Sequence, residues 1–393
     1  VVSLGTFLSI LLMLGVFPPL ILLLLYILYL SIVSAGQDFL AFGWEGFLLE
    51  VTINAFFISL SSDPNIFLWI SLNLVLFRFH FNGGTVKLQS RDPNWRNLTG
   101  VFYHYQSQPI PNAIAWYAYK LPMWFHKVST FLMLFVEIII PFGMFGPDWM
   151  RLVVFIAFVG LQLVIGITGN FSYLNFLTVA LCLILLSNAY LPWFEMPPME
   201  STSLPIFVLC TVAGIFLISL QLVHLWQHFL PNRLFQKLLN FFSPYHIANR
   251  YGIFAVMTTN RYEIIFEGSD DNENWQEYGF YYKPSEKNRR PVQISPYQPR
   301  LDWQAWFLPF GEPESHPWLQ HFIYHLLKGS PEVIKLIRTN PFPSSPPKYV
   351  RTVVYDYVFT SYEEKRKSGC WWRREYVGLF THSAHLRSQS SEV

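Results

Sequence analysis

Long apolar runs separated by short polar stretches occupy the first 230 residues of the chain. A helix needs about 20 mainly apolar residues to cross a bilayer core, where each backbone N–H and C=O must find its partner within the protein. The runs that reach or approach this length predict seven or eight spans, over Leu4–Val16, Pro19–Ser34, Trp44–Leu60, Ile66–Phe81, Trp124–Phe145, Leu152–Thr168, Phe171–Ser187 and Leu204–Trp226. Because the chain opens in an apolar run without an initiator Met, we expect further sequence upstream.

The composition changes sharply after the last of these runs. Hydrophobic residues make up 52% of the chain and charged residues only 13%, against about 25% charged in soluble proteins. Only 16 of the 52 charged residues lie before Pro231. We therefore predict a multi-pass helical membrane domain over 1–230 and a water-soluble domain over 231–380. The net charge of +2 does not favour nucleic acid as a partner.

The soluble part shows alternating, β-branched and aromatic patterns typical of strands. Tyr251–Thr259, Tyr262–Phe266 and Tyr349–Thr360 read as strands, and helical spacing follows prolines over Pro317–Lys328 and Pro331–Arg338. A polar Gly-Ser-Asp-Asp turn before Trp275 is similar to a hairpin of galactose-binding-like β-sandwiches. We predict a β-sandwich-like, α+β domain that ends in a disordered tail over 381–393.

Several charged residues lie inside or beside the predicted spans, among them Glu50, Arg78, Lys87 and Glu137. A charge at the centre of a membrane helix costs about 2.5–3.5 kcal/mol on insertion scales, so each one needs a partner or a wet cavity. Arg78 ends an apolar run and can pair with Glu50 or with Glu137. Lys87 follows a Gly-Gly pair at the membrane edge. It reads either as an ordinary lysine whose head reaches the interface or as a desolvated base.

The segment 82–123 is rich in Trp and Tyr, which favours an interfacial aromatic loop. Two sequons, at Asn97 and Asn170, are candidates for glycosylation. With eight spans, both lie on the side of the C-terminal domain, and a glycan would make that side lumenal or extracellular. The basic residues of the loop favour the opposite orientation by the positive-inside rule. The sequence leaves the orientation open.

Enzyme motifs are absent from the sequence. It contains no G-x-S-x-G, H-E-x-x-H, Walker or Rossmann pattern, and its three cysteines suggest neither a zinc site nor a disulfide framework. We therefore expect no metal and no cofactor. A β-rich domain on a membrane anchor is better suited to binding another protein than to transforming a metabolite.

Several long motifs extend from about Gly36 to about Phe380. They include Gly36-Gln37-Asp38-Phe39-Leu40, Trp44 to Glu50, Gly84-Thr85-Val86-Lys87-Leu88, Thr168-Gly169-Asn170, Glu267-Gly268-Ser269-Asp270-Asp271, Pro299-Arg300-Leu301-Asp302-Trp303-Gln304 and Asn340-Pro341-Phe342-Pro343. Together these motifs resemble the lipase maturation factor family, membrane proteins that help secreted lipases fold and assemble in the endoplasmic reticulum.

This resemblance implies a chaperone-like assembly factor for secreted lipases or other exported clients, bound through the C-terminal domain. Its location would be the endoplasmic reticulum membrane in a eukaryote or the inner membrane in a bacterium, in contact with membrane lipid. The candidates for client contact are Trp275, Tyr297, Arg300, Asp302, Trp303 and Trp306.

A looser resemblance links the membrane part to vitamin K-dependent γ-carboxylase. It implies an alternative function, an intramembrane carboxylase-like enzyme with Lys87 as the base. Glu50, Arg78 and Glu137 would then position the substrate.

Overall fold

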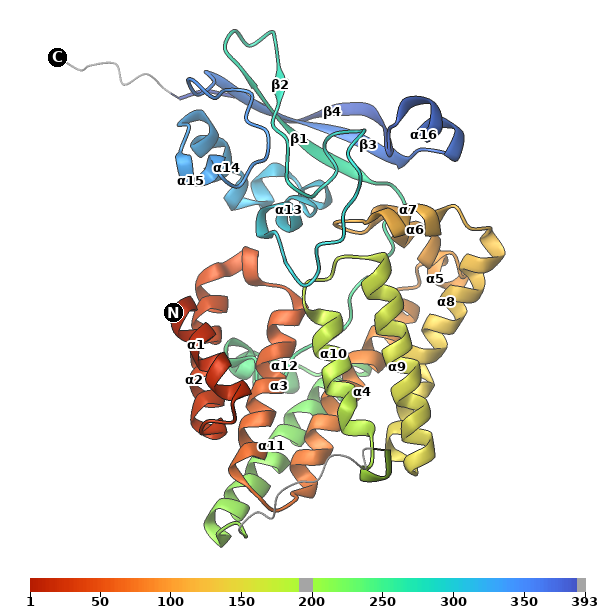
Figure 1. The fold of residues 1–393 in the computed structure, drawn as a ribbon, viewed down its shortest axis with the longest axis vertical. Helices are drawn as coiled ribbons and strands as arrows, with labels where there is room; N and C mark the ends of the chain where they lie inside the picture. Colours follow the sequence, from red (N-terminus) through yellow and green to blue (C-terminus); the bar gives the residue numbers. More distant parts are fainter. Residues whose placement is uncertain (191–200, 387–393) are drawn as a thin grey trace, which may run out of the picture. The chain divides into compact units, whose positions relative to one another are not determined.

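The computed structural model describes residues 1–190 and 201–386, and their internal contacts divide the chain into two units (Figure 1). The helical unit comprises 1–98, 127–164 and 173–256. The sheet unit comprises 99–126, 165–172 and the chain from 257 onward. This division differs from the predicted boundary at residue 230. Residues 231–256 belong with the helices, and two segments from between the helices, 99–126 and 165–172, belong with the sheet.

Helices make up most of the helical unit, and two of them, α8 and α9, each run a few residues into segments of the sheet unit. The α-helices are α1 (Val2–Met13), α2 (Pro18–Gly36), α3 (Gly43–Leu60), α4 (Ile66–Gln89), α5 (Pro93–Arg96), α8 (Met123–Ile138), α9 (Asp148–Thr168), α10 (Leu174–Cys182), α11 (Leu204–Phe229) and α12 (Arg233–Phe242). Short 3₁₀ helices are η1 (Gln37–Leu40), η2 (Ile140–Phe145), η3 (Leu183–Leu185), η4 (Asn188–Tyr190) and η5 (Ser243–Tyr245).

Five helices in the described residues are long and apolar enough to cross a membrane. They are α2 with η1, α4, α8 with η2, α9 and α11, and two shorter apolar helices cover Val2–Met13 and Leu174–Leu185. Within its most apolar stretch, α4 is 61% buried, against 17–33% for the other four. Helix α4 therefore lies inside the bundle, and its side chains mainly face protein.

Helix α4 is longer than the predicted span and begins and ends with defined caps. The Asn65 side chain accepts hydrogen bonds from the N–H groups of Phe67 and Leu68, which satisfies the start of the helix. The helix then continues past Phe81 to Gln89, so the Gly-Gly pair forms a helical contact and not a turn. A Cβ on Gly84 would lie 2.5 Å from the Ile138 side chain, so glycine allows α4 and α8 to approach closely. The predicted loop 82–123 thus begins as helix.

One four-stranded antiparallel sheet organises the sheet unit, in the order β2-β1-β3-β4. Its strands are β1 (Tyr262–Ser269), β2 (Gln276–Glu277), β3 (Tyr349–Phe359) and β4 (Trp372–Ala384). Its helices are α6 (Gly100–Ser107), α7 (Ala113–Tyr119), α13 (Arg300–Ala305), α14 (Pro317–Leu327), α15 (Pro331–Ile334) and α16 (Tyr362–Ser368), with η6 (Leu308–Phe310) and η7 (Pro313–Ser315). The prediction of membrane helices followed by an α+β, β-containing part is confirmed. Where a sandwich would have a second sheet, the described residues place helices.

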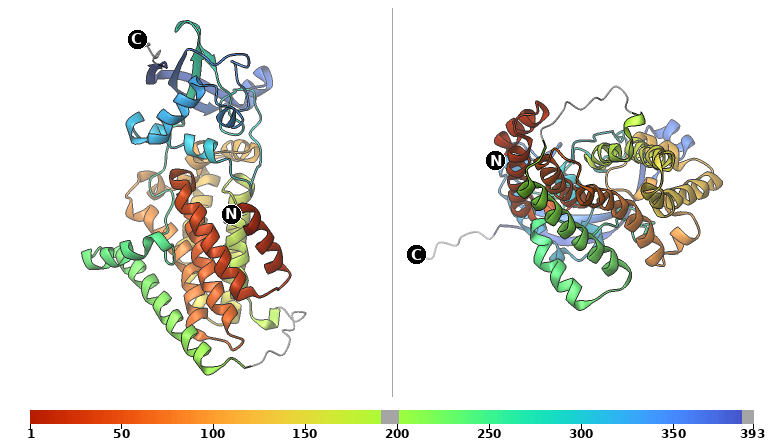
Figure 2. Two further views of the ribbon diagram at one scale, coloured as in Figure 1. Left: turned by 90° about the vertical axis from the view of Figure 1, so that its left-hand side faces the viewer. Right: turned by 90° about the horizontal axis from the view of Figure 1, so that it is seen from below.

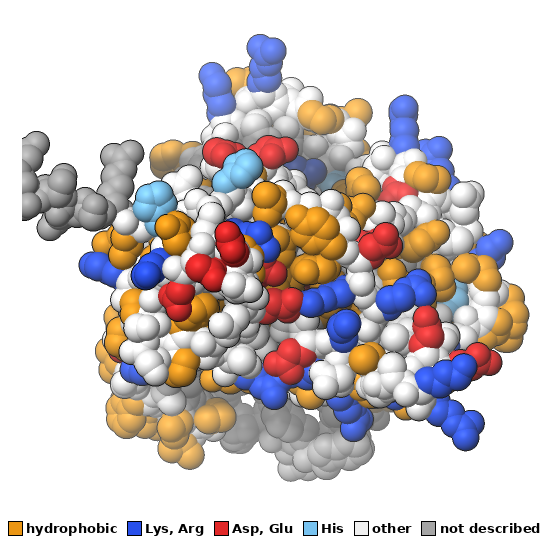
Figure 3. All heavy atoms as spheres, turned by 90° about the horizontal axis from the view of Figure 1, so that it is seen from above, with side chains coloured by type: hydrophobic (Ala, Val, Ile, Leu, Met, Phe, Trp, Pro, Cys, Tyr) orange, Lys and Arg blue, Asp and Glu red, His pale blue; other side chains and the backbone are white. Residues whose placement is uncertain are grey.

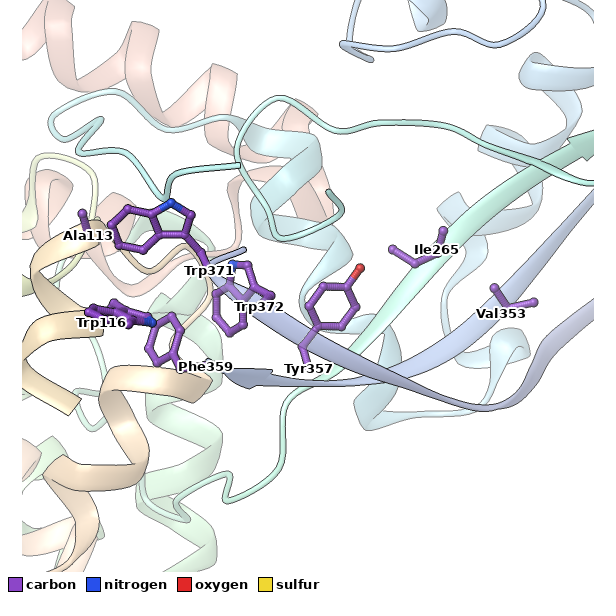
Figure 4. Packing of buried hydrophobic residues seen from close by; sticks show 8 residues of the cluster. All are labelled: Ala113, Trp116, Ile265, Val353, Tyr357, Phe359, Trp371 and Trp372. Carbon is purple, nitrogen blue, oxygen red and sulfur yellow. The ribbon is translucent and has the colours of Figure 1, made fainter. Parts of the chain in front are cut away.

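Central strands β1 and β3 form the core of this unit. Ile265 lies opposite Val353, and both side chains are fully buried. Figure 4 shows the aromatic cluster that extends from this pair to α7, formed by Ala113, Trp116, Ile265, Val353, Tyr357, Phe359, Trp371 and Trp372. On the sheet, Phe322 of α14 packs edge-on against Phe266, with 5.0 Å between ring centroids. The core therefore joins segments far apart in sequence.

Three local predictions for the soluble part are wrong. Residues 251–259 form no strand, although their composition favours one. The charged run 363–367, whose composition predicts a solvated turn, lies in helix α16, because Ser361 and Glu364 make a reciprocal capping box and Gly369 ends the helix at φ 71°. Strand β4 continues to Ala384, inside the predicted tail, whose last residues, 387–393, lie outside the described residues.

Candidate functional site

Helix α4 carries two buried ion pairs. The first joins Arg78 to Glu50 of α3, with 2.8 Å between Nη1 and Oε1 and neither side chain exposed. The second Glu50 oxygen, Oε2, accepts hydrogen bonds from the Tyr251 hydroxyl at 2.6 Å and from the Asn249 N–H at 2.8 Å. The Arg78 Nη2 group also donates to the Asn249 carbonyl. The sequence allows two partners for Arg78, and the structure selects Glu50.

This network binds the segment that follows α12, through Asn249 and Tyr251, to helices α3 and α4. Asn249 also donates from Nδ2 to the Gly46 carbonyl at 2.8 Å, at the start of α3. Gly46 leaves room for this contact, since a Cβ there would lie 2.8 Å from the Asn249 side chain. Sequence reasoning missed Asn249 and Tyr251 as partners of Glu50, because a polar residue in an irregular segment carries no pattern that identifies its contact.

The second ion pair joins Lys87 to Glu137 of α8. Lys87 Nζ lies 2.7 Å from Oε2 and 3.0 Å from Oε1 of Glu137, and 2.9 Å from the Gly83 carbonyl. An ammonium has three N–H donors, and each has an acceptor here. The side chains are 5% and 13% exposed, and the Trp95 ring lies 5.5 Å from Nζ. The geometry is that of a buried ion pair that holds α4 and α8 together.

A third acidic group, Glu45, is buried at the start of α3. Its Oε2 atom accepts hydrogen bonds from the hydroxyls of Tyr29 and Tyr173, the latter at 2.7 Å. Acidic groups are favourable in the first turn of a helix, where backbone N–H groups lack partners. Glu45 therefore links three segments of the helical unit. Among residues 1–190 and 201–386, no group of three or more His, Cys, Asp or Glu side chains is arranged to hold a metal ion.

The candidates for client contact all lie in the sheet unit, where some of their side chains are at least partly exposed and others are buried. Tyr297 is 59% exposed. Trp275 is half-buried, with the Arg351 guanidinium 4.0 Å above its ring. Trp306 is also half-buried, and its Nε1 donates to the Ser107 carbonyl at 2.9 Å. Arg300, half-buried, begins α13. These four residues remain predicted contacts.

Asp302 and Trp303 instead contribute to the fold. Both are buried, and one Asp302 oxygen accepts the N–H groups of Tyr282 and Lys283 at 2.7 and 2.8 Å. Burial raises the pKa of Asp302 above its ordinary value, and these hydrogen bonds oppose the rise. The Trp303 ring packs against Phe171, with 6.0 Å between centroids. Neither side chain is accessible to a client in this arrangement.

The two glycosylation candidates differ in the same way. Asn97 is exposed at the end of α5. Asn170 is buried, and its Nδ2 donates to the carbonyls of Val292 and Ile110 at 2.9 and 3.1 Å. Its Oδ1 accepts N–H groups of Ile294 and Ser295. A glycan on Asn170 does not fit the folded chain.

A buried charged triad in the sheet unit was not anticipated from the sequence. Glu263 on β1 lies 2.6 Å from Arg261 Nη2 and 2.7 Å from Lys283 Nζ. Arg261 also donates to the carbonyls of Gln106 and Pro109, at 2.9 and 2.8 Å. The triad thereby ties the segment after α6 to the sheet. A lone Glu in a strand-like run is the only trace of it in the sequence.

The exposed face of the C-terminal part mixes chemical types. Figure 3 shows acidic and basic side chains interspersed with hydrophobic ones, without a field of one sign. Such a mixed surface fits a protein partner better than a polyanion.

Two family profiles match the chain over both of its parts. The lipase maturation factor transmembrane domain matches residues 1–193, and the lipase maturation factor C-terminal domain matches residues 247–382. The chain belongs to the lipase maturation factor family. The predicted resemblance is thus confirmed, and with five span-capable helices in the described residues this family member is an integral multi-pass membrane protein.

Similar proteins in vertebrates carry the same family name. Lipase maturation factor 2 of Xenopus tropicalis is 31% identical, over 92% of this chain and 68% of its own. Lipase maturation factor 1 of Mus musculus is 32% identical, over 91% and 68%, and that of Homo sapiens is 32% identical, over 90% and 68%. No solved structure matches the chain. All four residues of the ion pairs on α4 lie in the range of the transmembrane-domain profile.

Proposed function

We propose that this protein is a membrane-anchored maturation factor that helps secreted lipases or other exported proteins reach their folded, assembled state. The observation that carries the proposal is the match of both family domains, which together extend over most of the chain. The relatives are named for lipase maturation. The protein would act in the endoplasmic reticulum membrane in a eukaryotic cell, or in the inner membrane in a bacterium.

Client binding is assigned to the C-terminal part because that part offers polar, aromatic side chains outside the membrane helices. Tyr297 is exposed, and the stacked pair of Trp275 and Arg351 presents an aromatic face beside a charge. Tyr, Trp and Arg are the residue types that most often dominate the free energy of protein–protein binding. A partly folded client exposes apolar surface that such side chains can bury without a cofactor or an energy source.

The test is co-expression of a dimeric lipase with the full chain. Secreted lipase activity and the dimer fraction should rise with the protein present, and the Tyr297→Ala/Trp275→Ala variant should lose most of this gain. Tyr376→Ala is the matched control, since Tyr376 on β4 is 55% exposed, close to the 59% of Tyr297. Equal client yield with and without the protein would refute the maturation function. Equal loss in the control variant would refute the assigned surface.

The carboxylase-like alternative depends on Lys87 acting as a base. A base needs a free lone pair within reach of the substrate proton. In the structure all three Lys87 donors point to acceptors, two of them carboxylate oxygens. This arrangement favours a structural role, and the maturation function remains our conclusion.

A further inference from the structure

Helix α12 begins directly after the last helix that can cross the membrane. Helix α11 ends at Phe229, and Asn232 already caps α12 through hydrogen bonds from the N–H groups of Leu234 and Phe235. Three residues span at most about 10 Å. The cap of α12 therefore lies within about 10 Å of the end of α11, the last helix in the described residues that is long and apolar enough to cross a membrane. In Figure 2 it projects sideways from that end of α11.

One stripe of α12 packs against α11. Leu239 is buried, the Phe242 ring lies 5.4 Å from that of Phe216, and the Phe235 ring lies 6.5 Å from that of Trp226. The residues of this stripe on α12 recur every three to four positions, as one face of a helix requires. These contacts hold α12 to α11.

A second apolar stripe on α12 has no protein cover among the described residues. Leu234, Leu238 and Phe241 are 74%, 41% and 68% exposed. They also recur every three to four positions and so share a face. Tyr245, just beyond the helix, is exposed as well. Three large apolar side chains in a row on a ten-residue helix are a poor surface to leave in water.

The remaining face of α12 is polar and carries only positive charge. Arg233, Gln236, Lys237 and Asn240 are all exposed, and the helix contains no acidic residue. At about 100° per residue these four positions fall within an arc of about 100°, opposite an apolar arc of about 160°. A polar face that carries Lys and Arg, opposite a face of large apolar residues, is typical of helices that lie in a membrane surface.

We propose that α12 lies in the plane of the membrane surface as an interfacial anchor. Leu234, Leu238 and Phe241 enter the boundary between headgroups and acyl chains, while Arg233 and Lys237 contact headgroups and favour anionic lipid. The uncharged polar residues of the helix, Gln236 and Asn240, face water. The position of α12 beside the end of a membrane-crossing helix selects lipid over a second copy or another protein, because the bilayer is the apolar phase within its reach.

The test uses the full chain in lipid nanodiscs and a fluorescent label placed on either side of the helix. Leu238→Cys marks the apolar stripe and Gln236→Cys, two residues away, is the matched control. Cys182 and Cys210 are buried, so we expect no labelling there, and Cys370→Ser is the background, in which the unlabelled chain should take up no dye. The label at 238 should emit at a shorter wavelength than the label at 236. Lipid that carries a shallow nitroxide should quench the label at 238 several-fold more than the label at 236. Iodide in the water should instead quench the label at 236.

A second measurement tests the charge preference. In the Leu238→Cys background, adding anionic lipid to neutral nanodiscs should increase lipid quenching, and Arg233→Gln/Lys237→Gln should remove that increase. Iodide quenching at 238 equal to that at 236 would overturn the proposal by placing both faces in water. Protection at 238 from lipid and iodide alike, or a disulfide between two copies at 238, would overturn it in favour of a protein cover.

Discussion

The Lys87–Glu137 pair allows a structural role and a chemical role to be separated by one set of variants. Lys87→Met leaves the Glu137 carboxylate without its cation, and Glu137→Gln leaves the ammonium without its anion. Breaking a buried pair by removing one partner costs about 3–5 kcal/mol. The 13% exposure of Glu137 puts each single variant at the lower end of this range, at about 3 kcal/mol. The double variant buries no charge, so we expect it within about 2 kcal/mol of the original chain.

An exposed pair of matched geometry serves as the control. Lys335 Nζ lies 3.0 Å from Glu332 Oε1, as Lys87 Nζ does from Glu137 Oε1, but the control side chains are 68% and 85% exposed. Solvent screening limits such a pair to below about 1 kcal/mol of coupling. Unfolding in mixed micelles, followed by tryptophan fluorescence, gives both double-mutant cycles. Equal coupling energies in the two cycles would refute the argument that burial sets the strength of the Lys87–Glu137 pair.

Client maturation by the same variants separates the two functions. If the pair is structural, Lys87→Met/Glu137→Gln should recover most of the lipase yield that each single variant loses. If Lys87 is a base, the double variant should be folded and still inactive, with a loss of orders of magnitude. A folded, inactive double variant would therefore refute our interpretation of Lys87.

Three further predictions concern packing, pH and glycosylation. Gly84→Ala should lower the free energy of unfolding by about 1–3 kcal/mol, because its methyl would stand 2.5 Å from a side-chain carbon of α8. Gly160→Ala is the control and should not destabilise the chain, since a Cβ there has nothing within 4 Å. Thermal unfolding measures both variants. Burial lowers the pKa of Lys120 from 10.5 to about 8, so the unfolded chain holds this proton more tightly than the folded chain does. The free energy of unfolding should therefore rise between about pH 8 and about pH 10.5. A series of unfolding curves at different pH measures this rise, and Lys120→Met should remove it. In a eukaryotic host, Asn97→Gln should remove any gel-mobility shift that deglycosylation produces. Asn170→Gln should leave that shift unchanged. It should also reduce the folded yield, because the four hydrogen bonds of the Asn170 side chain are lost.

The membrane helices could be predicted because hydrocarbon imposes one strong requirement, a long apolar run with its backbone hydrogen-bonded internally. The end of α4 could not, because Gly83 and Gly84 suit either a turn or a close helix contact. The choice depends on α8, whose Ile138 and Glu137 lie against Gly84. A feature decided by a neighbour some 50 residues away in sequence is invisible to a local pattern.

The sheet unit was harder to predict, for a related reason. Residues 251–259 have strand-like composition, but a strand needs a partner strand. Tyr251 belongs to the helical unit, where its hydroxyl donates to Glu50. Asp302 and Trp303 belong to a motif that resembles the family, and the sequence alone does not tell a buried position from an exposed one there. A family motif shows that residue types recur, and buried residues that build the fold recur as well as exposed ones.

The ion pairs on α4 also determine how functional data on this protein should be interpreted. Arg78 joins α4 to α3 and Lys87 joins it to α8, so the two pairs hold the most buried of the five span-capable helices in the described residues to two different neighbours. Loss of any one of the four charged groups leaves its partner unpaired in the bundle and weakens folding first. A single inactive variant at these positions is therefore expected whether the residue is structural or chemical. Only a charge-neutral double variant, compared with a matched exposed pair, distinguishes the two.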